Sequence, residues 1–210
     1  ALRLAKSRVE KTEVAVKSIF KDTKINHDGI QITKKFIPIQ STGCYIPGGL
    51  AKYPSSVIMS VIPAKVAGVK RIVVVSPPNS DGKIDPLTIV AADICGATEI
   101  YKTGGAQAIA AMTFGTNSIP KVSKIFGPGN QYVTAAKIKS LQFGTAIDMP
   151  AGPSELLVVA DDSANASFIA SDLLSQAEHG SDSQVVFVSL SKSLIKKVKS
   201  QIEIQKTGLS

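Results

Sequence analysis

The run Arg71-Ile72-Val73-Val74-Val75 decides the fold that this sequence predicts. Four successive β-branched apolar residues are typical of a strand that is buried on both faces of a parallel sheet. Further along, Asp85-Pro86 places an N-cap residue and a first-turn proline at the start of a helix that reaches about Ile94. This segment therefore predicts a buried strand followed by a covering helix.

The same alternation of strand and helix continues on both sides of this run. We expect further strands near residues 44–46, 99–101, 123–126, 156–160 and 184–189, and extended structure near 30–36 after a turn at 26–29. We expect helices over about 1–20, 54–68, 106–114, 131–141 and 164–178, and a basic amphipathic helix after residue 191. Repeated alternation of this kind predicts an α/β fold with a parallel sheet and right-handed crossovers.

The length, composition and cysteine pattern limit the classes of protein to which the chain could belong. The 210 residues suffice for one large domain or two small ones, and 44% of them are hydrophobic against 19% charged. We find neither an apolar run of membrane-spanning length nor a signal peptide, and Cys44 and Cys95 form no disulfide or metal-binding pattern. These features predict a cytoplasmic protein without a membrane partner. Ala1 stands where a Met is expected, which suggests either a fragment or removal of the initial Met.

The net charge of +8 raises the question of nucleic-acid binding. The excess lies at the ends, because residues 1–44 hold nine Lys or Arg against four Asp or Glu, and residues 191–210 hold five against one. Residues 45–190 are nearly neutral, with ten against eleven. No aromatic residues alternate with the lysines to stack on bases. We therefore expect no nucleic-acid partner, although a basic nucleic-acid-binding protein stays the most distant alternative.

Two glycine-rich turns lie between an expected strand and an expected helix. Gly104-Gly105 is followed by Gln107, and Gly127-Pro128-Gly129 is followed by Asn130. At such turns glycine permits close approach of a phosphate or ribose, but it also serves a tight turn that needs positive φ, and both interpretations stay open. An isolated Asn at this position more often caps its helix than contacts a ligand.

The strongest chemical signals lie in the loop 147–155 and the helical turn 175–180. The loop presents Ser154, and the turn places Gln176 and one of the two histidines, His179, on one helix face. Imidazole is a good zinc ligand and an amide oxygen a weak one. On these residues alone, a packed or dipole-stabilised histidine is the favoured interpretation.

Taken together, the segments resemble histidinol dehydrogenases. The runs that carry the resemblance are Tyr45-Ile46-Pro47-Gly48-Gly49, Gly104 to Ala111, Ile125 to Asn130, Ile147 to Glu155 and Ser171 to Gly180. They extend over about residues 43–190 and occur in the order found in that family. No single run would suffice.

The resemblance implies a set of roles. Tyr45, Gln107 and Asn130 match residues that contact NAD, Ser154 matches a substrate-binding residue, and Gln176 and His179 match zinc ligands that also lie against the substrate. It implies an NAD-dependent, zinc-dependent oxidation of L-histidinol to L-histidine in a homodimer.

The resemblance also implies what this stretch lacks. Members of the family are about twice as long, and their catalytic Glu-His pair and remaining zinc ligands lie beyond the position of Ser210, so the catalytic residues stay unknown here. Residues 45–155 would form an incomplete Rossmann-like domain, and residues 1–44 and 156–210 part of a second, discontinuous α/β domain. The alternative is a truncated, non-catalytic paralogue that binds nucleotide or dimerises.

Overall fold

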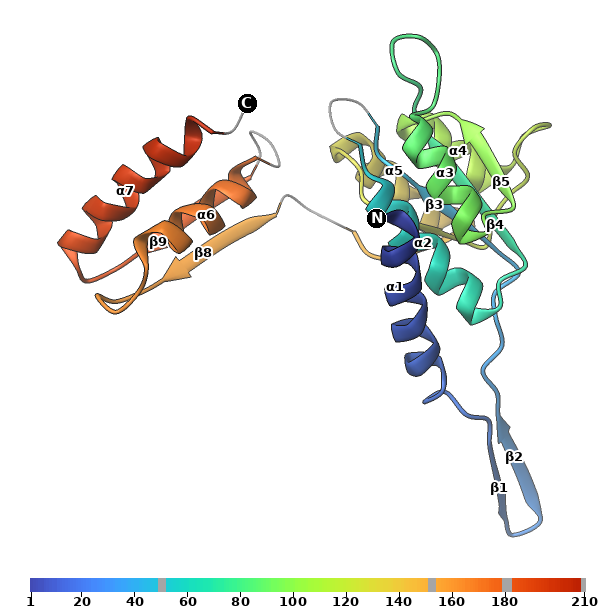
Figure 1. Ribbon diagram of the computed structural model, residues 1–210. Helices are drawn as coiled ribbons and strands as arrows, with labels where there is room; N and C mark the ends of the chain where they lie inside the picture. Colours follow the sequence, from blue (N-terminus) through green and yellow to red (C-terminus); the bar gives the residue numbers. More distant parts are fainter. Residues whose placement is uncertain (49–51, 151–153, 179–182, 209–210) are drawn as a thin grey trace. The chain divides into compact units, whose positions relative to one another are not determined.

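The computed structural model of the chain describes residues 1–48, 52–150, 154–178 and 183–208. They divide into two compact units, Ala1–Ala151 and Gly152–Ser210. Both units alternate strands with helices, which confirms the predicted α/β fold (Figure 1). Within the described residues, no helix has the length and apolar character needed to cross a membrane.

The first unit is built on a parallel five-stranded sheet. Its strands are β3 (Ser41–Tyr45), β4 (Arg71–Ser76), β5 (Glu99–Lys102), β6 (Lys124–Phe126) and β7 (Ala146–Ile147). Their spatial order is β5-β4-β3-β6-β7, and all neighbours are parallel. This is the strand order of a Rossmann-like sheet, in which the first strand lies between the second and the fourth. The winding direction therefore reverses between β3 and β6.

Helices cover both faces of this sheet (Figure 1). The helices of the unit are α1 (Leu2–Lys17), α2 (Pro54–Ala67), α3 (Pro86–Cys95), α4 (Gly105–Phe114) and α5 (Gln131–Ser140). Ile72 and Val74 pack with α1, α2 and α3, whereas Val73 and Val75 pack with α4 and α5. The apolar run of β4 is therefore buried on both faces, as its sequence predicts.

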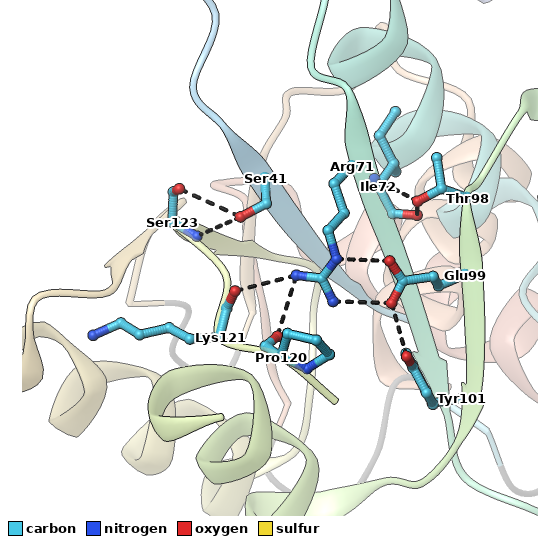
Figure 2. A network of polar contacts seen from close by, with 9 residues as sticks. All are labelled: Ser41, Arg71, Ile72, Thr98, Glu99, Tyr101, Pro120, Lys121 and Ser123. Carbon is cyan, nitrogen blue, oxygen red and sulfur yellow. Dashed lines mark hydrogen bonds and ion pairs between the residues drawn. The ribbon is translucent and has the colours of Figure 1, made fainter. Parts of the chain in front are cut away.

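A polar network fastens the amino-terminal edge of the sheet (Figure 2). The Arg71 guanidinium donates to both carboxylate oxygens of Glu99, at 2.6 and 2.9 Å, and to the backbone carbonyls of Pro120 and Lys121, at 3.2 and 3.1 Å. The Tyr101 hydroxyl donates to the same carboxylate at 2.8 Å. This network ties the starts of β4 and β5 to the segment that enters β6.

An antiparallel hairpin joins α1 to the sheet. Its strands are β1 (Thr23–His27) and β2 (Ile30–Lys34), and every residue of both is exposed. The sequence predicted extended structure only for the second strand. A short 3₁₀ turn, η1 (Leu141–Phe143), and the two-residue strand β7 were also not predicted.

The second unit is a single β-α-β-α segment. Parallel strands β8 (Glu155–Val159) and β9 (Gln184–Val188) pair over their whole length, and helices α6 (Ala166–Ala177) and α7 (Lys192–Lys206) accompany them. Its core is formed by residues of both helices and of one face of the strand pair, namely Ile169, Leu173, Leu194 and Val198 with Leu156, Val158, Val185 and Phe187.

The observed elements of the two compact units can be compared with the predicted domain boundaries. The sheet begins at Ser41, four residues before the predicted boundary at 45. Helix α1 packs on α2 and α3, with Leu2 and Val9 against their core. The grouping of residues 1–44 with 156–210 into one discontinuous domain stays a prediction.

Candidate functional site

The carboxyl edge of the five-stranded sheet gathers the candidate residues of the first unit. Strand β3 ends at Tyr45, β6 leads into the Gly127-Pro128-Gly129-Asn130 turn, and β5 leads into Gly104 and Gly105 at the start of α4. Because these strands are parallel, the segments that follow them all lie at the same edge of the sheet. The winding reversal between β3 and β6 marks the place where ligands of open α/β sheets bind.

Tyr45 links β3 to the start of α4. Its side chain is buried, and its hydroxyl oxygen accepts a hydrogen bond from the Gly105 N–H at 3.1 Å. Gln107 contacts the same glycine, because a Cβ placed on Gly105 would lie 2.6 Å from Gln107 Oε1. The structure therefore brings Tyr45 and Gln107 together around Gly105.

The Gly127 turn lies directly against the backbone of Tyr45. Gly127 has φ +114°, and a Cβ at this position would overlap the Tyr45 carbonyl oxygen. Only glycine combines that dihedral with so close an approach. The turn ends at Asn130, whose Oδ1 accepts a hydrogen bond from the Val133 N–H at 3.1 Å and caps α5. Asn130 is thus a helix cap, and its contact with NAD stays a prediction.

A buried ion pair that the sequence did not reveal lies at this turn. Lys137, on α5, has a side chain that is 3% exposed, and its ammonium pairs with the Asp148 carboxylate just after β7. The pair also bonds to the backbone of Gly127. The only available signal was the spacing, since Lys137 follows Val133 by one helical turn and so lies on its face of α5.

The pKa values of two groups in this region, the Asp148 carboxyl and the Cys44 thiol, are shifted in opposite directions. Burial acts to raise the pKa of Asp148, but hydrogen bonds from Lys137 and from the Gly127 and Met149 N–H groups outweigh it, so the pKa lies below its ordinary value. Burial, aided by the Asp148 charge, raises the pKa of the Cys44 thiol to about 12. Asp148 is therefore a fixed carboxylate, whereas Cys44 is an inert thiol.

A hollow of about 310 Å³ opens at the same edge, between the ends of β3 and β4 and the start of α3. Its lining includes Pro47, Ser76 and Asn79. The Lys52 ammonium lies 3.5 Å from the Asp85 carboxylate, and both residues line the hollow. Its volume suits part of a nucleotide-sized ligand.

The second unit brings together two of the predicted substrate and zinc residues. Gln176, on α6, donates from Nε2 to the backbone carbonyl of Ser154 at 3.2 Å and to Ser183 Oγ at 3.5 Å. These bonds occupy the amide nitrogen and leave Oε1, an acceptor, as the atom that would ligate a metal. The sequence placed Ser154 and Gln176 in one site only through the family resemblance, whereas the structure shows their contact.

The predicted metal ligand His179 lies outside the described residues, as do residues 151–153 of the preceding loop. Where the structure describes side chains, it brings together no group of three or more His, Cys, Asp or Glu residues that could hold a metal ion. Gln176 alone would therefore supply one weak oxygen ligand, and the fit of zinc depends on His179 and further ligands.

Comparisons with known proteins agree on one family. The family model described as histidinol dehydrogenase matches residues 1–210. A histidinol dehydrogenase of Colwellia psychrerythraea is 56% identical over 184 residues, covering 87% of this chain and 42% of that protein. One of Archaeoglobus fulgidus is 48% identical over 203 residues, covering 97% and 50%.

A solved structure extends the likeness to three dimensions. The crystal structure of histidinol dehydrogenase from Elizabethkingia anophelis matches with a TM-score of 0.89 and 48% identity, over 99% of this chain and 48% of that one. The chain thus spans about half the length of the relatives that it matches.

Proposed function

The chain belongs to the histidinol dehydrogenase family, and from that membership we propose that the protein oxidises L-histidinol to L-histidine with NAD. This is a four-electron oxidation through histidinaldehyde, so two hydrides pass to two NAD molecules in each turnover, and one water supplies the second carboxylate oxygen as protons are released. The observation that carries the proposal is the family match over the whole of residues 1–210. An aldehyde held by the enzyme between the two transfers would be protected from side reactions.

The carboxyl edge of the sheet supports the cofactor part of this proposal. Tyr45, Gln107 and Asn130 would contact NAD, and they lie on segments that meet at this edge. The N-cap of α4, Gly104, has no side chain, and the Tyr45 hydroxyl already accepts from the Gly105 N–H, so the next N–H groups of the first turn, those of Ala106 and Gln107, are suited to an anionic group such as the pyrophosphate. When bound, NAD supplies the hydride acceptor; the residues named here orient it.

The Ser154 and Gln176 contact supports the substrate part. We propose that Gln176 and His179 are two of the zinc ligands and that Ser154 binds the substrate beside them. Zinc would position the amino alcohol through its amine and imidazole, which is the templating use of a metal. The hydrogen bond from Gln176 Nε2 to the Ser154 carbonyl would hold Oε1 in a fixed direction for that task.

We propose further that the protein acts as a homodimer in the cytoplasm. The hairpin supports pairing, because Ile25, Ile30 and Ile32 are all exposed and their cross-strand register places them on one face. The two cysteines are buried free thiols, which suits a reducing compartment.

The proposed function is tested by NADH formation from histidinol, with zinc present, in the natural full-length protein. The expected result is about two NADH for each histidinol consumed. A protein that binds NADH but forms none from histidinol would instead be a non-catalytic paralogue. Replacement of His179 by Ala should lower both the zinc content and the rate, and an unchanged zinc content would refute its role as a ligand.

Asn130 offers a sharper test of the cofactor site. Asn130→Asp keeps a helix-capping oxygen but replaces the amide donor with a negative charge, so the KM for NAD should rise about tenfold or more while α5 stays capped. Asn165, which caps α6 through the Ser167 N–H at 2.9 Å, provides the matched control. Asn165→Asp should leave the KM for NAD unchanged, and equal behaviour of the two variants would remove Asn130 from the site.

A further inference from the structure

The buried Lys137–Asp148 pair lies at the turn that follows β6, at the carboxyl edge of the first unit's sheet. Lysine is seldom buried so completely, and a buried ion pair by itself is weak evidence for stability. The pair joins three segments, since Lys137 belongs to α5, Asp148 follows β7, and both bond to the turn after β6. Its location therefore calls for an explanation beyond stability.

The hydrogen bonds of the pair hold the two peptide groups that flank Gly127, one through its N–H and the other through its carbonyl oxygen. Lys137 Nζ donates to the Gly127 carbonyl oxygen at 2.7 Å and to Asp148 Oδ1. The Gly127 N–H donates to Asp148 Oδ2 at 2.9 Å, and the Met149 N–H donates to Oδ1 at 2.8 Å. The N–H and the C=O of Gly127 are thus both fixed by charged partners, in a closed ring of hydrogen bonds.

This ring controls the turn that approaches Tyr45. Gly127 already needs φ +114° and lies against the Tyr45 carbonyl, so its orientation cannot drift without separating the turn from β3. Asn130 is three residues further along and is the N-cap of α5, the helix that carries Lys137. Charge-assisted bonds of this kind are strong and directional, so they would hold both Gly127 and Asn130 in place.

We propose that Lys137 and Asp148 are positioning residues for the cofactor, which hold the Gly127–Asn130 turn against Tyr45 in the geometry that NAD requires. The proposal rests on the proposed function, because it assumes that this turn contacts NAD. Neither side chain acts on the substrate, since both are committed to the backbone and to each other. A displacement of about 1 Å in such a turn is enough to weaken binding and catalysis severely.

The Arg71–Glu99 pair provides a natural control. It is also partly buried and also bonds to backbone carbonyls, but it lies at the opposite, amino-terminal edge of the sheet (Figure 2). Loss of either pair should lower stability. Only the loss of the Lys137–Asp148 pair should also displace the Gly127–Asn130 turn at the carboxyl edge.

The test compares Asp148→Asn, Lys137→Met, Lys137→Arg and Glu99→Gln in the natural full-length protein. The dissociation constant of NADH, measured by fluorescence, and the KM for NAD should rise about tenfold or more in Asp148→Asn and Lys137→Met, with the zinc content and the KM for histidinol unchanged. Lys137→Arg keeps the charge and should recover part of that loss, whereas Glu99→Gln should bind NADH as the parent protein does.

Each outcome decides between positioning and stability. If the two variants bind NADH as tightly as Glu99→Gln does at equal thermal stability, the pair is merely structural and the proposal fails. If one variant does not fold, the other and Lys137→Arg apply the same criterion. A parent protein that binds NADH but does not oxidise histidinol refutes the proposed function alone, and one that does not bind NADH refutes both.

Discussion

At the scale of single residues, Gly127 is the position where the fold and the candidate site constrain each other most. Gly127→Ala would place a Cβ on the Tyr45 carbonyl oxygen in addition to the cost of a positive φ. Gly144 has φ +74° with open space around its Cβ position, so Gly144→Ala measures the dihedral cost alone, about 1–2 kcal/mol.

We therefore expect Gly127→Ala to lower the free energy of unfolding by roughly 1–3 kcal/mol more than Gly144→Ala does. Denaturant unfolding of the two variants measures the difference. Equal losses would show that the turn moves away from Tyr45 without cost, and would also weaken the case for a turn held rigidly by Lys137 and Asp148.

Asp148 makes stability depend on acid pH. Its pKa is lower in the folded protein than the ordinary value of 3.8, so its contribution to stability is complete above 3.8 and is lost as the pH falls from there through the folded pKa. Asp148→Asn leaves Lys137 buried without its anion and should cost about 2–4 kcal/mol at neutral pH, allowing for the 27% exposure of the Asp148 side chain.

The difference in unfolding free energy between the parent protein and Asp148→Asn should therefore shrink below about pH 4. Unfolding curves of both proteins over a pH series measure it directly. Because Glu10, Glu99 and Asp161 also have lowered pKa values, only this difference isolates Asp148. A difference that stays constant down to strongly acid pH would mean that the pair does not stabilise the fold through its charge.

At the scale of elements, local sequence signals predicted most of what the structure contains. The strand at 71–75 and the capped helix from Asp85 were confirmed because their signals are local: continuous β-branched residues, and a cap followed by proline. Strand β7 has two residues and β1 is exposed along its whole length, so neither was predicted, whereas β2 was expected as extended structure near residues 30–36.

The candidate site was predictable in part for the same reason. The glycine turns with Gln107 and Asn130 are local patterns, and their roles came from the family resemblance. The Lys137–Asp148 pair joins residues that meet only after β6, α5 and β7 have packed, and no local pattern marks such a meeting. The spatial order of the strands, which brings the glycine turns to one carboxyl edge, is likewise a property of the whole sheet.

Helix α3 shows how much one local signal contributes. The Asp85 carboxylate accepts hydrogen bonds from the Leu87 and Thr88 N–H groups at 2.9 and 3.4 Å. Asp85→Ala should lower the free energy of unfolding by about 1 kcal/mol, and Asp85→Asn, which keeps the cap but loses the charge facing Lys52, should cost only a few tenths. Equal losses in chemical denaturation would assign the effect to the ion pair instead.

At the scale of the whole molecule, the exposure of the β1–β2 hairpin is the feature that the packing of the first unit does not explain. A two-stranded hairpin alone is marginally stable in water. In this hairpin Ile25 pairs with Ile32, and Ile30 lies on the same face, so one face is largely apolar. The opposite face carries the Lys24–Thr33 pair. An amphipathic hairpin of this kind is typical of a segment that buries its apolar face against another chain.

If a second copy of the protein covers that face, the double variant Ile25→Ser/Ile32→Ser should shift the full-length protein from dimer towards monomer. Two isoleucines are each worth about 1.5–3 kcal/mol when fully buried, so the dimer dissociation constant should rise at least tenfold. Lys24→Ser/Thr33→Ser changes the adjacent pair on the other face and should leave it unaltered. Sedimentation equilibrium over a range of protein concentrations measures both constants. A dimer that the isoleucine variant leaves intact would place the subunit interface elsewhere, and the apolar face would then need a different partner.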